Sequence, residues 1–175
     1  MIRKILLAYD GSENSRRALD LAAELAVKLD AGLMIAHVLM HGRPPEELVR
    51  MAEVENLLVS AHEPPKPELN VSAGQVFERF AATKDYVGAQ RVISSIGDQL
   101  ISFAKTRSEE LGVADIQTGI HVGDYAEEIL EAADDYQADM IVMGSRGLGT
   151  LKGAVLGSVS LKVLHNAAQT VVAVK

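Results

Sequence analysis

The sequence predicts an α/β protein: a doubly wound, five-stranded parallel sheet with helices on both faces. Short apolar runs alternate along the chain with segments whose apolar residues recur at helical spacing. Strands that alternate with helices form parallel sheets, and helices then cover both faces. The runs are also apolar throughout, without the polar alternation of half-exposed strands, which is typical of strands buried on both sides.

Five apolar runs predict the strands of this sheet. The first run is followed by the turn Asp10-Gly11-Ser12, and the second run follows Asp30-Ala31-Gly32, which ends the first helix. The fourth run leads directly into a glycine-rich segment. The predicted strands are residues 5–9, 33–39, 116–122, 140–143 and 170–174.

The segments between these runs predict helices. After the first strand, apolar residues recur at positions 18, 21, 22, 25, 26 and 29, which is helical spacing. Ser12 stands where its side chain is expected to cap this helix. A further helix is predicted over residues 126–136, with acidic residues early, and the last over residues 159–166.

The composition limits the class of protein. With 175 residues, the chain is expected to form one domain. A formal net charge of -7 argues against a nucleic-acid or anionic-membrane surface, and no apolar run approaches the ~20 residues of a bilayer span. The absence of cysteine excludes disulfides, thiolate catalysis and thiolate metal sites. The N-terminal residues show no signal-peptide pattern, so a cytoplasmic location is expected.

The glycine-rich segment before the last helix carries the strongest functional signal. Its spacing is Gly144-x2-Gly147-x9-Gly157-Ser158. Glycines let the backbone turn with positive φ and come close to a ligand, and the following helix N-terminus offers unpaired N–H groups to phosphate. The spacing is neither a Walker A loop nor Gly-x-Gly-x-x-Gly, because Lys152 stands at the third glycine position. The segment predicts a site for a nucleotide or another phosphorylated small molecule. The alternative is a loop whose glycines serve only turns and close packing.

The chemistry of this segment indicates roles for its residues. Gly144 and Gly147 allow close approach to ribose and phosphates. A side chain at Gly147 would require either a strained left-handed backbone or space that the ligand needs. Gly157 and Ser158 begin the last helix, where N–H groups and a hydroxyl can donate to phosphate oxygens, and Ser160 is expected to add another donor.

The segment and its flanks resemble the ATP-binding branch of the universal stress protein family. The similarity includes the opening Ile5-Leu6-Leu7-Ala8-Tyr9-Asp10-Gly11-Ser12, Ile35-Ala36-His37-Val38 at the end of the second strand, and Gly123-Asp124 after the third. Residues 1–39 and 113–175 match the family's layout in order and spacing. The resemblance implies an adenine nucleotide alpha hydrolase-like fold with strand order 3-2-1-4-5, in which the ends of strands one and four meet at one crevice.

Further roles at that crevice follow. Asp10 is expected to accept from a ribose hydroxyl or to help hold a divalent cation. The resemblance implies that backbone groups near Val38 read the adenine edge and that residues ending strands one and four line the base and ribose. Tyr9 replaces a small aliphatic residue often found in the family, and either stacks or crowds the pocket. Arg146 contacts phosphate or is solvated. The expected nucleotide-binding residues are Ala8, Tyr9, Asp10, Val38, Met143, Gly144, Arg146, Gly147, Gly157, Ser158, Val159 and Ser160.

The middle of the chain, at about residues 41–90, matches the family poorly and is interpreted as an insertion into a single domain of residues 1–175. The predictions for this region are a short helix over residues 46–60, an extended linker over 63–67 and a long helical pattern over 76–111. Gly88 and Gly97 weaken the long pattern and can divide it. The segment is either an elaborated crossover that covers the sheet, or a lid or partner surface.

Enzymatic interpretations have little support. His37 and His41 have i,i+4 spacing, but at a strand end this spacing does not converge on a metal, so His37 is better explained as a packed or hydrogen-bonded strand residue. Asp10 and Asp124 are the carboxylates expected near the crevice, and Asp124 is more typical of a helix cap. No Gly-x-Ser-x-Gly elbow is present. No catalytic residue and no direct metal motif are therefore predicted.

The sequence thus predicts an ATP-binding regulatory or stress-response protein, with AMP or ADP as alternative ligands and Mg or Mn arriving with the nucleotide. The resemblance implies a homodimer through antiparallel pairing of the C-terminal strand, an apolar edge whose only charge is Lys175. An unidentified protein partner is left open as an alternative. Two alternatives stay open: a slow ATP hydrolase or nucleotide-processing enzyme of the same fold, and an interaction protein that binds AMP or no nucleotide.

Overall fold

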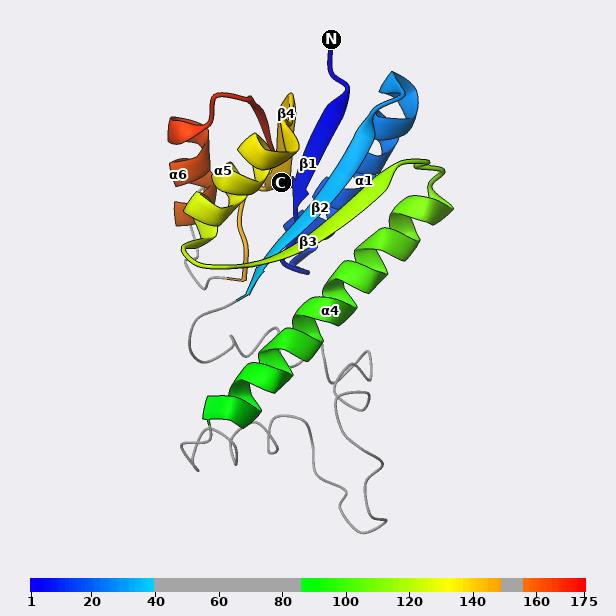
Figure 1. Ribbon diagram of the computed structural model, residues 1–175. Helices are drawn as coiled ribbons and strands as arrows, with labels where there is room; N and C mark the ends of the chain where they lie inside the picture. The colour runs from blue at the N-terminus through cyan, green and yellow to red at the C-terminus, as the bar shows by residue number, and fades with distance from the viewer. Residues whose placement is uncertain (40–85, 149–155) are drawn as a thin grey trace.

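The computed structural model describes residues 1–39, 86–148 and 156–175 (Figure 1). Strands and helices alternate along these ranges, and every predicted strand is found with ends that agree to within one residue. The elements are β1 (Lys4–Ala8), α1 (Glu13–Leu29), β2 (Gly32–Leu39), α4 (Tyr86–Glu110), β3 (Ile116–Val122), α5 (Tyr125–Tyr136), β4 (Met140–Gly144), α6 (Ser158–Asn166) and β5 (Thr170–Val174). Within the described ranges, no helix combines the length and apolar character needed to cross a bilayer.

The strands of the described chain form one five-stranded parallel sheet in the order β3-β2-β1-β4-β5, which confirms the predicted fold class. The middle strand, β1, pairs with β2 on one side, where Ala8 lies opposite Ala36, and with β4 on the other, where Ala8 lies opposite Met143. The chain first winds outward through β2 and β3 and then crosses to the other side for β4 and β5. A crevice opens at the carboxyl ends of strands where the winding reverses in this way.

Helices cover both faces of the sheet, with α1 and α4 on one face and α5 and α6 on the other (Figure 1). One hydrophobic cluster joins the sheet to α1 and α4 and includes Leu7, Ile35 and Leu100. The second joins the sheet to α5 and α6 and includes Leu6 and Ile141. Successive strand residues point to opposite faces, so the neighbours Leu6 and Leu7 are both fully buried but in different clusters. This double burial explains the uninterrupted apolar runs.

Side chains cap the starts of two helices. Ser12 caps α1 as predicted: its Oγ accepts from the backbone N–H of Ser15 at 3.3 Å. Asp124 caps α5, where its Oδ1 accepts from the N–H groups of Ala126 and Glu127, both at 3.1 Å. The cap function expected for Asp124 is therefore confirmed.

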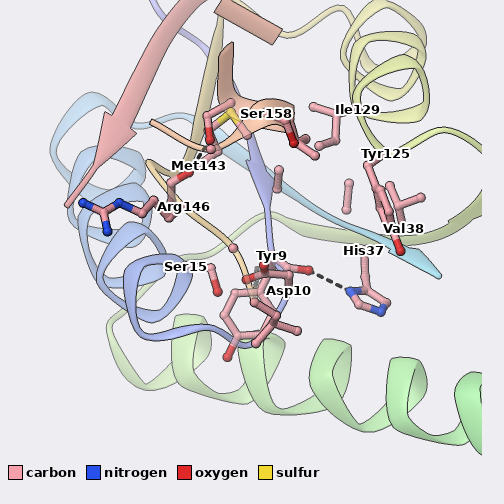
Figure 2. Close-up of a pocket in the computed structure, with 18 of the residues that line it drawn as sticks. Tyr9, Asp10, Ser15, His37, Val38, Tyr125, Ile129, Met143, Arg146 and Ser158 are labelled. Carbon is pink, nitrogen blue, oxygen red and sulfur yellow. Dashed lines mark hydrogen bonds between the residues drawn. The ribbon is translucent and has the colours of Figure 1, made fainter. Parts of the chain in front are cut away.

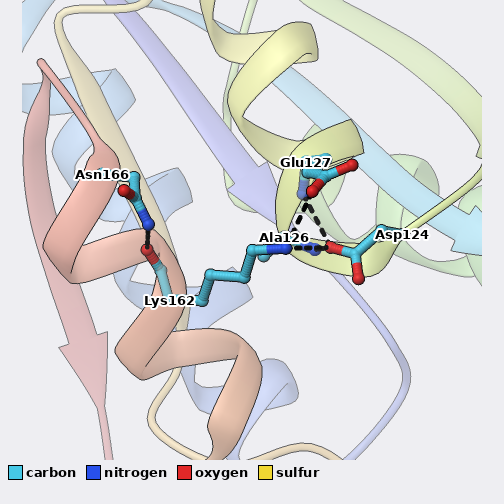
Figure 3. A network of polar contacts seen from close by, with 5 residues as sticks. All are labelled: Asp124, Ala126, Glu127, Lys162 and Asn166. Atoms are coloured by element: carbon cyan, nitrogen blue, oxygen red, sulfur yellow. Dashed lines mark hydrogen bonds and ion pairs between the residues drawn. The ribbon is translucent and has the colours of Figure 1, made fainter.

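A surface network of polar contacts joins the start of α5 to α6 (Figure 3). Nζ of Lys162 lies 3.0 Å from Oδ1 of Asp124 and 3.0 Å from Oε1 of Glu127. The hydrogen bond from Lys162 is the main cause that lowers the pKa of the Asp124 carboxyl, and the N–H of Glu127 adds to it. These side chains are largely exposed, so we expect the network to orient the two helices more than to stabilise the fold.

Helix α4 is continuous over residues 86–110, so the expectation that Gly88 and Gly97 divide it is wrong. Gly97 faces the sheet: a Cβ placed there would lie 2.7 Å from Cδ2 of Leu39 and 3.2 Å from Cδ2 of His37. The glycine therefore lets α4 pack closely on the end of β2, at a propensity cost of about 1 kcal/mol. Three predictions lie outside the described residues: the helix over 46–60, the linker over 63–67 and the helical pattern over 76–85.

We expect Gly97→Leu to lower the free energy of unfolding by about 1–3 kcal/mol, because the new side chain has no room between α4 and the end of β2. Ser94→Leu, at an exposed position of the same helix, is the matched control and should change it by less than about 0.5 kcal/mol. Urea denaturation followed by circular dichroism measures both values. Equal stability of Gly97→Leu and wild type would show that this contact is not tight.

Candidate functional site

A cavity of about 360 Å³ opens at the carboxyl ends of β1, β2 and β4, beside the reversal in strand order (Figure 2). In open parallel sheets, this is where ligands bind. Every residue that the sequence analysis assigned to nucleotide binding lines this cavity. These residues come from the ends of β1 and β2, the end of β4 with the loop after it, and the start of α6. The fold therefore brings these separate segments together.

Sequence reasoning missed a group of lining residues. Tyr125 and Ile129 have i,i+4 spacing and present one face of α5 to the cavity, a pattern that the sequence already contains. His37 was expected to be a packed or hydrogen-bonded strand residue and not a lining residue, although it stands beside Val38. The missed residues are Ser15, Ala36, His37, Tyr125, Ile129, Leu148 and Leu156.

The turn after β1 meets the loop after β4 at Asp10. Oδ1 of Asp10 accepts from the backbone N–H of Ser12 at 3.0 Å. A Cβ on Gly147 would lie 2.4 Å from Oδ2 of the same carboxylate, so a side chain there would displace the Asp10 carboxylate from this position. Gly147 is not among the residues with positive φ, so clearance from Asp10, and not a left-handed backbone, explains this glycine. The left-handed turn is at Gly11, whose φ of 79° leads the chain into α1.

Two other glycines hold this region together for different reasons. A Cβ on Gly144 would lie 2.9 Å from the backbone nitrogen of Ser15, so β4 ends directly against the first turn of α1. Gly157 is the N-cap of α6, and its N–H donates to the carbonyl of Ser145 at 2.8 Å. A Cβ on Gly157 would meet atoms of the described residues only at 3.5 Å or more, an ordinary contact. Packing against the described residues therefore does not require a glycine at position 157.

The two serines at the start of α6 differ in their surroundings. Ser158, the first residue of the helix, is exposed. Ser160 is buried, and its hydroxyl donates to the carbonyls of Gly144 at 3.1 Å and Ser145 at 2.9 Å. Its single proton is engaged within the protein, so the expectation that Ser160 donates to a phosphate is not met. Its bonds tie α6 to the end of β4.

Tyr9 and Arg146 both line the cavity, but their side chains leave it. Tyr9 is 2% exposed, and its ring belongs to the hydrophobic cluster between the sheet and α1 and α4. The ring thus packs on the opposite face of the sheet from Ala8. In this position it neither stacks on a base beside Ala8 nor crowds that side of the pocket. Figure 2 shows the exposed Arg146 guanidinium extending away from the other labelled side chains.

The cavity has two chemically different ends. Ala36, Val38 and Ile129 are buried apolar residues at one end. The other end is formed by the loop of residues 144–148 and by the N-terminus of α6, where unpaired N–H groups and the helix dipole favour negative charge. Such a cavity suits a ligand that joins an apolar ring to an anionic group.

Carboxylates contribute little to the lining. Asp10 is the one acidic side chain among the described lining residues, and Asp124 does not reach the cavity. Across the ranges that the structure describes, no three His, Asp or Glu side chains gather closely enough to hold a metal ion. His41, the partner of His37 in the i,i+4 pair, lies outside the described residues.

His37 is a buried, hydrogen-bonded strand residue, as expected. Its Nδ1 lies 2.8 Å from the carbonyl oxygen of Tyr9 (Figure 2). A carbonyl can only accept, so Nδ1 carries the proton and donates. Burial lowers the pKa of His37 below its usual 6.5, while the bond to Tyr9 and the nearby Asp10 carboxylate oppose part of that shift. The ring is therefore neutral at pH 7.

We expect the stability of the protein to fall as the pH falls below 6.5, and His37→Asn to weaken this dependence. The unfolded chain takes up the His37 proton at a higher pH than the folded protein does. The stability due to neutral His37 is thus complete above pH 6.5 and is lost as the pH falls through the lower folded-state pKa, by at most about 1.4 kcal/mol per pH unit. Urea denaturation of wild type, His37→Asn and the exposed control His165→Asn measures the slopes. Equal slopes in wild type and His37→Asn would contradict this.

Comparisons with known proteins give the family. The sequence pattern of the Universal stress protein family matches residues 1–175. Stress response protein NhaX of Bacillus subtilis (strain 168) is 32% identical over 164 residues, which cover 91% of this chain and 90% of that protein. Universal stress protein YxiE of the same organism is 34% identical over 163 residues, which cover 93% and 92%.

A solved structure of a universal stress protein in complex with cAMP has the same fold. It superposes with a TM-score of 0.62 at 25% sequence identity, over 99% of this chain and 97% of that chain. The family pattern spans the whole sequence, and two relatives above 30% identity cover more than nine-tenths of it. The chain therefore belongs to the universal stress protein family.

Proposed function

We propose that this chain binds an adenine nucleotide, with ATP as the preferred ligand, and acts as a regulatory module of the stress response. The observation that carries the proposal is the convergence of the Asp10 turn, the loop of residues 144–147 and the start of α6 on one cavity with an apolar end. A nucleotide has matching parts in matching order: an aromatic base, a hydroxyl-bearing ribose and an anionic phosphate chain. The related structure in complex with cAMP supports this ligand class.

The apolar end is the proposed base site. Ala8 and Ala36 lie side by side across β1 and β2, and two such small side chains leave space above the sheet that larger ones would fill. Val38 and Ile129 are buried beside it and wall the space. In this proposal the base lies on the two alanines, and backbone groups of Val38 meet its edge.

Asp10 is the proposed ribose ligand. One of its oxygens already accepts the N–H of Ser12, and a carboxylate has further acceptor capacity for a ribose hydroxyl. Among the described lining residues, Asp10 is also the carboxylate that could contact a divalent cation bound to the phosphates. Mg or Mn is usually held by one or two carboxylates together with substrate phosphates, so the cation would arrive with the nucleotide.

The start of α6 is the proposed phosphate site. Its N-cap residue, Gly157, has no side chain that could accept from the first N–H groups of the helix, and Ser158 is exposed in the first turn. Helix N-termini attract phosphate because their first N–H groups lack intrahelical partners and carry the positive end of the dipole. Because packing against the described residues leaves room for a side chain at position 157, ligand clearance is the proposed reason for this glycine.

We expect Gly157→Asp to weaken ATP binding by at least about tenfold, because it places a negative charge beside the phosphates. Calorimetric titration measures the affinity, and circular dichroism confirms the fold. Ala168→Asp, which adds the same charge at an exposed position past the other end of α6, is the matched control and should bind like wild type. Ser158→Ala should be milder than Gly157→Asp, since the backbone donors remain. If folded Gly157→Asp bound ATP with wild-type affinity, the proposal that the phosphates bind at this helix would be wrong.

Incubation with ATP and Mg separates a binding module from an ATP hydrolase. The proposal expects about one ATP bound per chain and no release of ADP over many binding lifetimes. Chelation of the cation is expected to weaken ATP binding, and Asp10→Ala should reduce that effect, because Asp10 is the proposed contact for the cation. Sustained release of ADP would contradict the regulatory role and show that the protein is an ATP hydrolase.

The same family resemblance leads us to propose a homodimer through β5. This strand lies at the end of the sheet and pairs only with β4 in the described chain. Residues 171–174 are half-buried, and α6 beside it exposes Leu161 (49%) and Leu164 (38%). An apolar edge strand with unpaired backbone groups is normally protected, and pairing with the same strand of a second copy would protect β5.

We expect Val172→Pro to convert the dimer into a monomer, because proline removes a backbone N–H and disturbs the edge. Val122→Pro, at the opposite edge strand β3, is the matched control and should leave the dimer intact. Sedimentation velocity at micromolar protein concentration reports the assembly state. A wild-type monomer, or a dimer that survives Val172→Pro, would exclude this interface.

A further inference from the structure

His37 links the end of β2 to the turn that carries Asp10. It follows Ala36, which pairs with Ala8 at the end of β1. The N–H of Tyr9 donates to the carbonyl of Ala36 at 2.9 Å and extends the β1–β2 ladder by one bond. The carbonyl of Tyr9 then accepts from a side chain, the ring of His37, at 2.8 Å.

This hydrogen bond acts on the peptide unit that joins Tyr9 to Asp10. The unit is planar, so a bond that fixes its carbonyl oxygen also fixes its N–H and the direction in which the chain enters Asp10. On the other side, the Asp10 carboxylate accepts from the N–H of Ser12 at 3.0 Å. Asp10 is therefore held from two sides, and His37 supplies one of them.

The surroundings of His37 confine its ring. The residue is 6% exposed, and α4 approaches it so closely that a Cβ on Gly97 would lie 3.2 Å from its Cδ2. His37 also lines the cavity, next to Val38. A confined ring with its proton on Nδ1 keeps the bond to Tyr9 in place, whereas a residue without a donor would lose that bond.

We propose that His37 is a positioning residue for the ribose end of the site: through Tyr9, it holds the Asp10 carboxylate where a ribose hydroxyl is bound. The inference rests on the proposed nucleotide site and adds a residue that acts without touching the ribose. It makes His37 responsible for part of the preference for a ribonucleotide over a nucleotide that lacks the ribose hydroxyls.

Titration calorimetry with ATP and 2′,3′-dideoxy-ATP tests this preference in wild type, His37→Leu, His37→Asn and Asp10→Ala. Wild type is expected to favour ATP by about tenfold, as the loss of a hydrogen bond to a charged group predicts. Asp10→Ala should abolish the preference. His37→Leu, which lacks the donor, should reduce it to less than about threefold while dideoxy-ATP affinity stays within about twofold of wild type. His37→Asn keeps an N–H donor near the position of Nδ1 and should retain most of the preference.

His165→Leu removes an exposed histidine on α6, outside the cavity, and should behave like wild type. Equal losses for both nucleotides in His37→Leu would reduce His37 to a structural role and overturn the inference. A wild-type protein that binds both nucleotides equally would overturn it while leaving the proposed function intact. Wild type that binds neither would overturn the proposed function, and the inference with it.

A measurement on the wild-type protein covers the case in which His37→Leu does not fold. Long-range ¹H–¹⁵N NMR spectra distinguish the two tautomers of a neutral imidazole. The inference requires the His37 proton on Nδ1, with ring signals that respond more to ATP than to dideoxy-ATP. A proton on Nε2, or equal responses to the two nucleotides, would overturn it.

Discussion

The position of β1 in the middle of the sheet is the constraint on which the site depends. The strand pairs with neighbours on both edges, and helices cover both faces of the sheet, so its residues are buried on both sides, as the fully buried Ile5, Leu6 and Leu7 show. The chain then has to leave β1 in one direction and return on the other side of it. This reversal brings the carboxyl ends of β1 and β4 together, although more than 130 residues separate them in sequence. The cavity is a consequence of that topology.

Close contacts between segments that are distant in sequence give the cavity its shape. Gly147 leaves room for the Asp10 carboxylate, and Gly144 lets β4 end against the first turn of α1. Ser160 and the N–H of Gly157 tie α6 to the end of β4 by hydrogen bonds. Each contact joins a segment of one half of the sheet to a segment of the other, or a helix start to a strand end. The polar groups at the cavity are thus held in place by the fold before any ligand binds.

Most of the fold was predictable because its signals are local. Continuous apolar runs predicted the strands to within one residue, and Ser12 and Asp124 marked helix starts through their capping chemistry. The strand order and the base-pocket residues Ala8, Tyr9, Val38 and Met143 came from the family resemblance, since periodicity does not determine which strands pair, whereas the glycine spacing itself indicated the phosphate end. The gathering of those residues around one cavity agrees with that resemblance.

The errors of the sequence analysis have a common physical cause, which is tertiary contact. Gly97 weakens a helix in isolation, but packing against Leu39 and His37 favours it. Ser160 has a donor that the sequence assigns to a ligand, yet burial commits it to two carbonyls. The orientation of the Tyr9 ring is the exception, because the alternation of strand residues by itself places the ring on the opposite face from Ala8. The linking role inferred for His37 depends on one bond to a residue 28 positions away.

The most direct test of the nucleotide site is an NMR titration of the ¹⁵N-labelled protein with ATP in the presence of Mg. The proposed site predicts that the amides of Asp10, Val38, Gly147 and Ser158 change most and saturate together, while those of the edge strand β3 away from the cavity stay unchanged. These four amides lie on four different segments that meet only at the cavity. Unchanged amides at these positions under saturating ATP, or larger changes elsewhere in the described chain, would contradict the proposed site.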